Sequence, residues 1–415
     1  MKPKNNWQLA LLGAVAAFCT YACMYAFRKG ITAATFDGMA FWGINYKILL
    51  LTTQVFGYAV SKMLGIKIVS EMSPARRAVN LLLFVGFAEA ALLAFAVVPA
   101  PYNIIFLFLN GLPLGMVYGT VLGFLEGRRE TDAMVAGLTA SFIFASGVVK
   151  TIGKYLLQVG VSEFWMPATT GLIFATPLLV SVWALARLPP PTAEDRELRT
   201  ERKPMNQAER ARFVQTFGFG LVALIMSYVL LSVFRDFRDN FAPEILAASG
   251  IKDPFIFTQT ETAVSVFILV LMAGLRYITD NYRAFQVINL LLLLGGLTIG
   301  ISTWFFQQGL LGAGPWFALT GVGLYLAYVP LNGIFFERMV ALFKYVSTVG
   351  FVVTLADSYG YMGSVAVLLY KNFGQPTISF LDFFIYGGYI LAVLYSILVI
   401  ISFAYFRKKY RAMVV

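Results

Sequence analysis

The sequence predicts an all-α membrane protein with twelve transmembrane helices in two pseudo-symmetric bundles of six. Three observations carry this prediction. Of the 415 residues, 59% are hydrophobic and only 13% are charged, whereas charged residues make up about a quarter of soluble domains. Twelve apolar stretches approach the roughly 20 residues that a helix needs to cross a bilayer. One long polar segment separates the first six stretches from the last six.

Charged residues, prolines and glycines mark the ends of the apolar stretches. The polar segment Pro189–Arg212 predicts three parts: a first bundle over 1–188, a cytoplasmic linker over 189–212 and a second bundle over 213–415. The expected spans lie near 7–34, 46–64, 78–98, 102–125, 134–158, 165–187, 213–241, 255–278, 285–306, 315–336, 347–370 and 380–406.

The formal net charge of +11 indicates membrane topology. The lysines and arginines lie in short loops between apolar stretches, which disfavours nucleic-acid binding and fits the excess of basic residues in cytoplasmic loops. With both termini and the linker in the cytoplasm, most basic residues fall on that side. We therefore expect a multi-pass protein of the bacterial inner membrane. Lys2 and Lys4 precede an apolar run that continues to Arg28 without a small-residue cleavage site, which argues against a signal peptide.

The composition excludes several kinds of chemistry. The chain has no histidine, and its two cysteines, Cys19 and Cys23, lie one helical turn apart in an apolar run. No zinc, haem or iron–sulfur ligand set can be assembled from them at the usual spacing. Phosphate-binding, hydrolase and dinucleotide motifs are missing from the sequence as well. We expect no enzyme activity, no cofactor, no metal and a monomeric state.

Each predicted bundle begins with a helix that carries an arginine after a phenylalanine. Arg28 lies 21 residues after Trp7, and Arg235 lies 22 residues after Phe213. In transporters built from repeats, the substrate site lies where the repeats meet near mid-membrane, so a matched arginine pair predicts an anion site. The alternative is that both arginines mark helix ends and extend toward the lipid headgroups.

Other candidates are basic and aromatic. Tyr21, Tyr25 and Arg28 share one face of the first helix, as a cavity wall would. Lys62 in the second helix either lines a cavity or reaches the cytoplasmic surface. Lys150 and Lys154 share a face of the fifth helix.

The acids within the spans are few. They are Glu89, Glu261 and Asp357. Each either pairs with a nearby basic residue or serves proton coupling, because the chain has no histidine for that role.

These residues resemble motifs of the major facilitator superfamily, and among its members those of the organophosphate:phosphate antiporters, which include glycerol-3-phosphate and hexose-phosphate transporters. The resemblance covers the whole chain, and the matched arginines are its specific part. The matching segments are Tyr25-Ala26-Phe27-Arg28-Lys29, Gly57-Tyr58, Ser61-Lys62, Gly65, Glu71, Arg76-Arg77, Arg235 eight residues before Pro243, and Tyr359-Gly360-Tyr361-Met362-Gly363-Ser364-Val365.

The chain also departs from that family. Ser146 stands near the position of a family histidine on the fifth helix, with Lys150 one turn further on. Glu71 replaces the usual loop aspartate, and its spacing from Lys62 is one residue longer. These departures indicate a changed anionic ligand. The resemblance implies a site built from Arg28, Lys29, Tyr58, Lys62 and Arg235, beside the candidates Tyr21, Tyr25, Lys150 and Asp357.

The sequence therefore predicts a secondary transporter of a small anionic, phosphorylated metabolite that works by alternating access in exchange for inorganic phosphate. One alternative is a proton-coupled carrier of a neutral or carboxylate solute, in which the arginines pair with Asp236, Asp239 or Asp357. Another is a transporter-like membrane receptor for a phosphorylated ligand.

Overall fold

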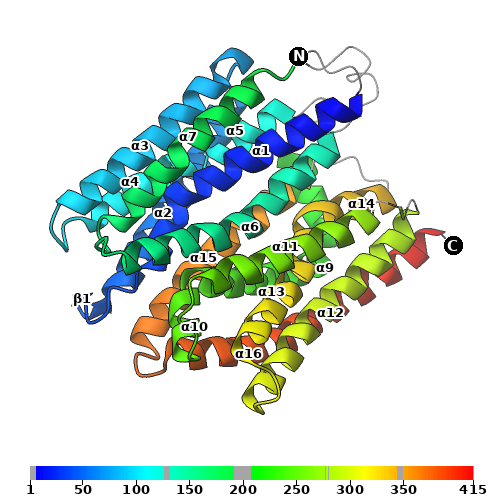
Figure 1. Cartoon of the computed structure of the whole chain (residues 1–415). Helices are drawn as coiled ribbons and strands as arrows, with labels where there is room; N and C mark the ends of the chain where they lie inside the picture. Colours follow the sequence, from blue (N-terminus) through cyan, green and yellow to red (C-terminus); the bar gives the residue numbers. More distant parts are fainter. Residues whose placement is uncertain are drawn as a thin grey trace. The chain divides into compact units, whose positions relative to one another are not determined.

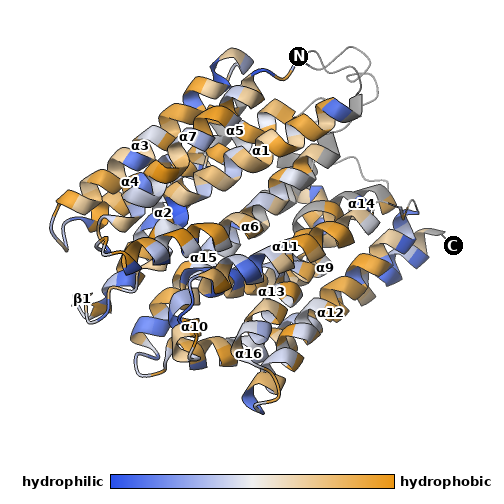
Figure 2. Ribbon diagram, viewed as in Figure 1, coloured by the Kyte–Doolittle hydropathy of each residue, from blue (hydrophilic) through white to orange (hydrophobic). Residues whose placement is uncertain are grey.

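A computed structural model describes residues 6–125, 131–190, 207–275, 277–278, 280–343 and 349–414. The chain is almost entirely helical, as its long apolar stretches require (Figure 1). Apolar residues are widespread along the helices (Figure 2). Lys2, Lys4 and the linker residues 191–206 lie outside the described residues.

The chain divides into two compact units, which we describe separately. Unit 1 comprises Met1–Thr200 and Asp253–Thr262, and unit 2 comprises Glu201–Lys252 and Ala263–Val415. In chain order, the elements before the linker are α1 (Asn6–Lys29), η1 (Gly30–Ala33), β1 (Ala40–Phe41), β2 (Ile44–Asn45), α2 (Tyr46–Ser70), η2 (Pro74–Arg76), α3 (Arg77–Val97), α4 (Ile104–Leu114), α5 (Val117–Leu125), α6 (Thr131–Gln158) and α7 (Met166–Ala186).

After the linker, most of the helices belong to unit 2. The first turns of one of them, residues 255–262, belong to unit 1. The elements are α9 (Gln207–Asn240), α10 (Ala242–Ala248), α11 (Phe255–Leu275), α12 (Asn281–Gln307), α13 (Ala313–Pro330), η3 (Leu331–Phe335), α14 (Phe336–Leu342), α15 (Val349–Phe373) and α16 (Phe380–Val414).

All twelve expected spans contain helix. Ten helical segments in the described part of the chain are long and apolar enough to cross a membrane. The other two expected spans correspond to α13, which runs through the π-helical turn η3 into α14, and to α15, whose middle carries Asp357, Gly360, Gly363 and Ser364. The fourth expected span is broken into α4 and α5 just after Pro113, where a proline removes a helical hydrogen bond.

Small residues let helices approach closely within each unit. A Cβ added at Gly111 of α4 would lie 2.3 Å from the carbonyl oxygen of Gln54 on α2, and one added at Gly57 would lie 2.3 Å from that of Phe108. In unit 2, a Cβ at Gly295 of α12 would lie 2.5 Å from the oxygen of Gly323 on α13. In membranes, where water supplies no driving force between helices, such close contact is a main source of stability.

Gly111→Ala is therefore expected to destabilise unit 1, because the added methyl group meets fixed backbone. We expect a loss of about 1–3 kcal/mol, the usual cost of overpacking a core, seen as a lower Tm of the purified protein in detergent. The matched control is Gly86→Ala on α3, where an added Cβ meets nothing within 4 Å. Equal Tm values for the two variants would contradict the close α2–α4 contact.

Candidate functional site

The guanidinium of Arg28 lies against an aromatic ring from the next helix. Arg28 is the penultimate residue of α1, and only 8% of it is exposed. Its Cζ lies 3.7 Å from the ring centroid of Tyr58 on α2, and Nζ of Lys62 lies 5.6 Å from the same centroid. The negative face of a tyrosine ring attracts cations. Tyr58 thus holds two positive charges near each other in unit 1.

Two buried amide side chains fix the end of α1 that carries Arg28. Gln54 donates from Nε2 to the carbonyl oxygen of Arg28 at 2.9 Å and to Oδ1 of Asn110 at 2.8 Å. Asn110 donates from Nδ2 to the carbonyl oxygens of Phe27 and Ala88, both at 3.0 Å. We call Gln54 and Asn110 the amide pair. It joins α1, α2, α3 and α4 beside the arginine.

The two tyrosines of α1 that the sequence singles out lie near each other. The rings of Tyr21 and Tyr25 are 6.2 Å apart, and Tyr21 meets Tyr118 of α5 edge-on at 5.5 Å. Lys29, the last residue of α1, is 5% exposed, and its carbonyl oxygen accepts the hydroxyl of Thr32. Arg28, Tyr58 and Lys62 form one cluster. Tyr25 and Tyr21 lie on α1 one and two turns before Arg28.

Lys150 lies on α6 of unit 1. It is 1% exposed and donates from Nζ to Oγ of Ser146 at 2.6 Å. Its neighbour Thr151 donates to the carbonyl oxygen of Pro254 at 2.8 Å, and a Cβ at Gly147 would lie 2.8 Å from Cβ of Glu261. This part of α6 therefore faces the first turns of α11. Lys154, one turn on, is half-buried.

Arg235 in unit 2 repeats the stacking of Arg28 but has an acidic neighbour. Its Cζ lies 4.4 Å from the ring centroid of Tyr328 on α13. Its Nε and Nη2 donate to Oδ1 of Asp236 at 3.1 and 2.9 Å, and the other carboxylate oxygen accepts the hydroxyl of Ser364 at 2.7 Å. The two side chains are 17% and 14% exposed. The positive charge of Arg235 is therefore balanced by its neighbour.

Two tyrosines connect Arg235 to Asp357. The hydroxyls of Tyr328 and Tyr228 are 2.9 Å apart, and their ring centroids are 5.3 Å apart. Tyr228 donates its hydroxyl to Oδ1 of Asp357 on α15. The structure thus places both predicted residues of unit 2, Arg235 and Asp357, in one polar cluster. Its members are Tyr228, Arg235, Asp236, Tyr328, Asp357 and Ser364.

Several buried polar residues were not predicted from the sequence. Gln54, Asn110, Tyr228, Tyr328 and Arg238 carry polar groups inside apolar stretches, which is itself a signal of function or of helix–helix hydrogen bonding. Arg238 is 2% exposed and donates from Nη2 to the carbonyl oxygen of Phe317 at 2.9 Å. Its Cζ lies 4.0 Å from the ring centroid of the same phenylalanine. It stabilises the contact between α9 and α13.

The chain shares its fold with solved transporters. It matches a bacterial homologue of the human drug peptide transporters PepT1 and PepT2 with a TM-score of 0.62 and 13% identity, covering 98% of this chain and 100% of the other. A D-xylose–proton symporter matches with a TM-score of 0.60 and 15% identity over 96% and 97% of the two chains. These likenesses confirm that the chain has the all-α membrane fold of these transporters.

A third solved structure supports the same fold. A bacterial homologue of the human lysosomal transporter Spinster has a TM-score of 0.63 and 11% identity, with 98% of both chains covered. No curated protein matches the sequence. A family profile matches residues 30–409, which is most of the chain. The protein therefore belongs to DUF5690, a family of unknown function.

Proposed function

We propose that this protein is a secondary active transporter that moves a small anionic, phosphorylated metabolite by alternating access in exchange for inorganic phosphate. The observation that carries the proposal is the pair of arginines, of which Arg28 is buried and Arg235 is half-buried. Each lies late in the first helix of its bundle and stacks on a tyrosine from another helix, Arg28 on Tyr58 and Arg235 on Tyr328. The resemblance to organophosphate:phosphate antiporters supports the phosphate-containing substrate.

The chemistry of the two arginines suits a phosphate monoester. Such a group carries about −1.5 to −2 charges near pH 7 and three acceptor oxygens. A guanidinium binds these oxygens through two parallel hydrogen bonds, which a lysine cannot do. In the proposed site Arg28 and Arg235 bind the phosphate, Lys29, Lys62 and Lys150 raise the local positive potential, and Tyr21, Tyr25 and Tyr58 shape the cavity.

Asp236 gives Arg235 a second role. Because Asp236 already accepts two hydrogen bonds from Arg235, an arriving phosphate competes with a carboxylate for the same donors. Release of Asp236 on binding would alter its hydrogen bond to Ser364 on α15. We propose that this exchange of partners links occupancy of the site to movement of α15 relative to α9.

The electrical cost of transport favours exchange. Moving one net charge through 100 mV changes the free energy by about 2.3 kcal/mol, so uncoupled import of a dianion into a negative cell is opposed. Outward movement of phosphate offsets most of this cost. We further propose that the protein is a monomer in the bacterial inner membrane with both termini in the cytoplasm.

Arg28→Lys and Arg235→Lys are each expected to reduce phosphate exchange in liposomes to background. Lysine keeps the charge but loses the planar fork, and loss of a charge-assisted pair costs at least a factor of 10–100. The control is Arg187→Lys, because Arg187 is exposed and stacks on Trp183 at 4.1 Å. Unchanged Tm values would show that the variants fold. If either variant exchanges phosphate at a near-normal rate, that arginine does not bind the transported solute.

The second candidate function is proton-coupled transport of a neutral or carboxylate solute, and two observations favour it. Arg235 pairs with Asp236, which lowers the net charge offered to an anion. Glu89 on α3 is only 8% exposed, and among the described residues neither of its carboxylate oxygens has a hydrogen-bond partner. A carboxylate buried in this way is costly as an ion, and ionisable residues within membrane spans commonly serve proton pathways.

Liposomes separate the two coupling schemes. Under phosphate exchange, uptake of labelled phosphate requires phosphate inside the vesicles, and a pH gradient alone drives none. Glu89→Gln should then leave exchange within about twofold of the wild type, because the amide replaces a group that does not act. Uptake into phosphate-free vesicles that follows an inward proton gradient, and that Glu89→Gln abolishes, would establish the proton-coupled alternative.

A further inference from the structure

The C-terminal helix α16 has a surface face that changes from apolar to cationic along its length. Its exposed apolar residues recur at helical spacing, so they share a face. They are Ile390, Val393, Leu394, Ile397, Ile400 and Ile401, each 37–59% exposed. Arg407, Lys408 and Arg411 continue the same spacing and are exposed as well. We call this the α16 face.

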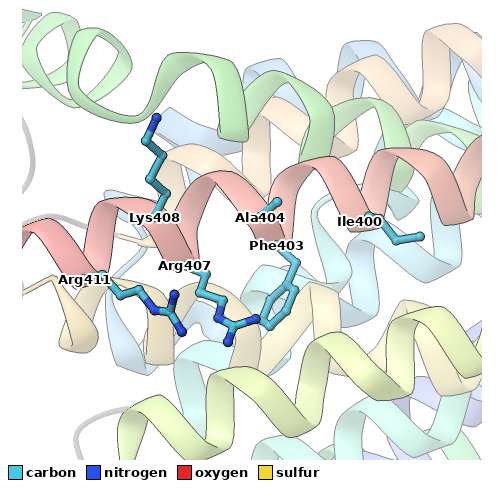
Figure 3. Close-up of a pocket in the computed structure, with 6 residues that line it drawn as sticks. All are labelled: Ile400, Phe403, Ala404, Arg407, Lys408 and Arg411. Carbon is cyan, nitrogen blue, oxygen red and sulfur yellow. The ribbon is translucent and has the colours of Figure 1, made fainter.

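A shallow groove lies at the point where the α16 face changes from apolar to cationic residues. It has a volume of about 340 Å³ and is lined by Ile400, Phe403, Ala404, Arg407, Lys408 and Arg411. Figure 3 shows Phe403, Arg407 and Arg411 leaving the helix on the same side, with Lys408 on the other side. The groove thus offers an apolar wall at one end and two guanidinium groups at the other.

Neighbouring side chains hold the groove in place. Phe403 stacks on Phe285 of α12 with ring centroids 5.9 Å apart, and Tyr410 stacks on Tyr282 at 4.5 Å. Lys409 turns to the opposite side, where it donates to the carbonyl oxygen of Thr216 on α9. Of the four cations at this helix end, Lys409 therefore contacts α9, whereas Arg407, Lys408 and Arg411 are exposed.

The charges of α16 near the groove are positive. The sequence of α16 contains a single acid, Asp382, which lies 25 residues before Arg407. On α12, Arg283 adds another exposed cation, and the carboxylate of Asp280 accepts a hydrogen bond from the backbone N–H of Arg283 at 2.7 Å. The groove therefore complements an anion attached to an apolar chain.

We propose that this groove binds an anionic phospholipid, with its phosphate on Arg407 and Arg411 and an acyl chain along the apolar part of the α16 face. From Ile390 to Ala404 this part spans about 21 Å at 1.5 Å per residue, which exceeds the ~15 Å depth of one leaflet in a ~30 Å hydrocarbon core. Basic pockets beside membrane helices bind anionic headgroups. The inference is independent of the transported solute.

The test uses the full-length protein, delipidated in detergent, with native mass spectrometry to measure binding of phosphatidylglycerol. Arg407→Gln/Arg411→Gln is expected to weaken that binding roughly 30-fold, the equivalent of about 1 kcal/mol per arginine near an anionic headgroup. The control Arg76→Gln/Arg187→Gln removes the same charge at exposed positions of unit 1 and should leave the affinity within about twofold. Unchanged Tm values would show that both variants fold. If the double variant Arg407→Gln/Arg411→Gln does not fold, Arg411→Gln alone takes its place in the measurement.

Comparison ligands separate a lipid site from an anion site. Phosphatidylcholine should bind at least tenfold more weakly than phosphatidylglycerol, and inorganic phosphate should not displace the lipid. The proposal is overturned if the two lipids bind equally, if phosphate competes fully, or if the control variant loses as much affinity as the groove variant. An unchanged affinity of the groove variant would overturn it as well.

Discussion

The amide pair Gln54–Asn110 is the interaction on which the arrangement of unit 1 depends. A polar group buried among apolar helices is costly unless it is hydrogen-bonded, and these two side chains are 3% and 0% exposed. Between them they reach carbonyl oxygens on α1 and α3 from α2 and α4. Glycines at 57 and 111 bring α2 and α4 close enough for this to happen. The position of Arg28 over Tyr58 follows from that close packing.

Unit 2 positions its arginine by a different arrangement. The carboxylate of Asp236 binds Arg235 and a serine of α15, and the tyrosines 228 and 328 extend the network to Asp357. Arg235 is thus held by acid and hydroxyl groups, whereas the backbone of Arg28 is held by amides. In the proposed cycle, this difference makes Arg235 the residue that exchanges partners when an anion binds.

Sequence patterns were sufficient for the helices, whereas the site stays a prediction. The apolar spacing predicted helix at every expected span, because a lipid environment leaves few other structures available. Arg28, Tyr58, Lys62, Arg235 and Asp357 were predicted to share one site. The structure shows Arg28 with Tyr58 and Lys62 in one cluster and Arg235 with Asp357 in another, and their joint action on a solute stays a prediction. The break between α4 and α5, the acceptors of Gln54 and Asn110, and the tyrosine link from Arg235 to Asp357 depend on which helices pack together. A single sequence does not specify that choice. Lys150 was grouped with Arg28 by its charge. The structure shows its bond to Ser146, and a shared site with Arg28 stays a prediction.

The most direct test of the central claim is ligand-induced stabilisation of the purified wild-type protein. A ligand that binds only the folded state raises its stability, by about 2.7 kcal/mol at a concentration of 100 Kd. Inorganic phosphate, sugar phosphates, dicarboxylates and neutral sugars would be compared at equal ionic strength. If the two arginines bind phosphate, Tm rises with phosphate and with at least one phosphorylated compound, and neutral sugars leave it unchanged. A rise with neutral sugars alone would contradict an anion site built on the two arginines.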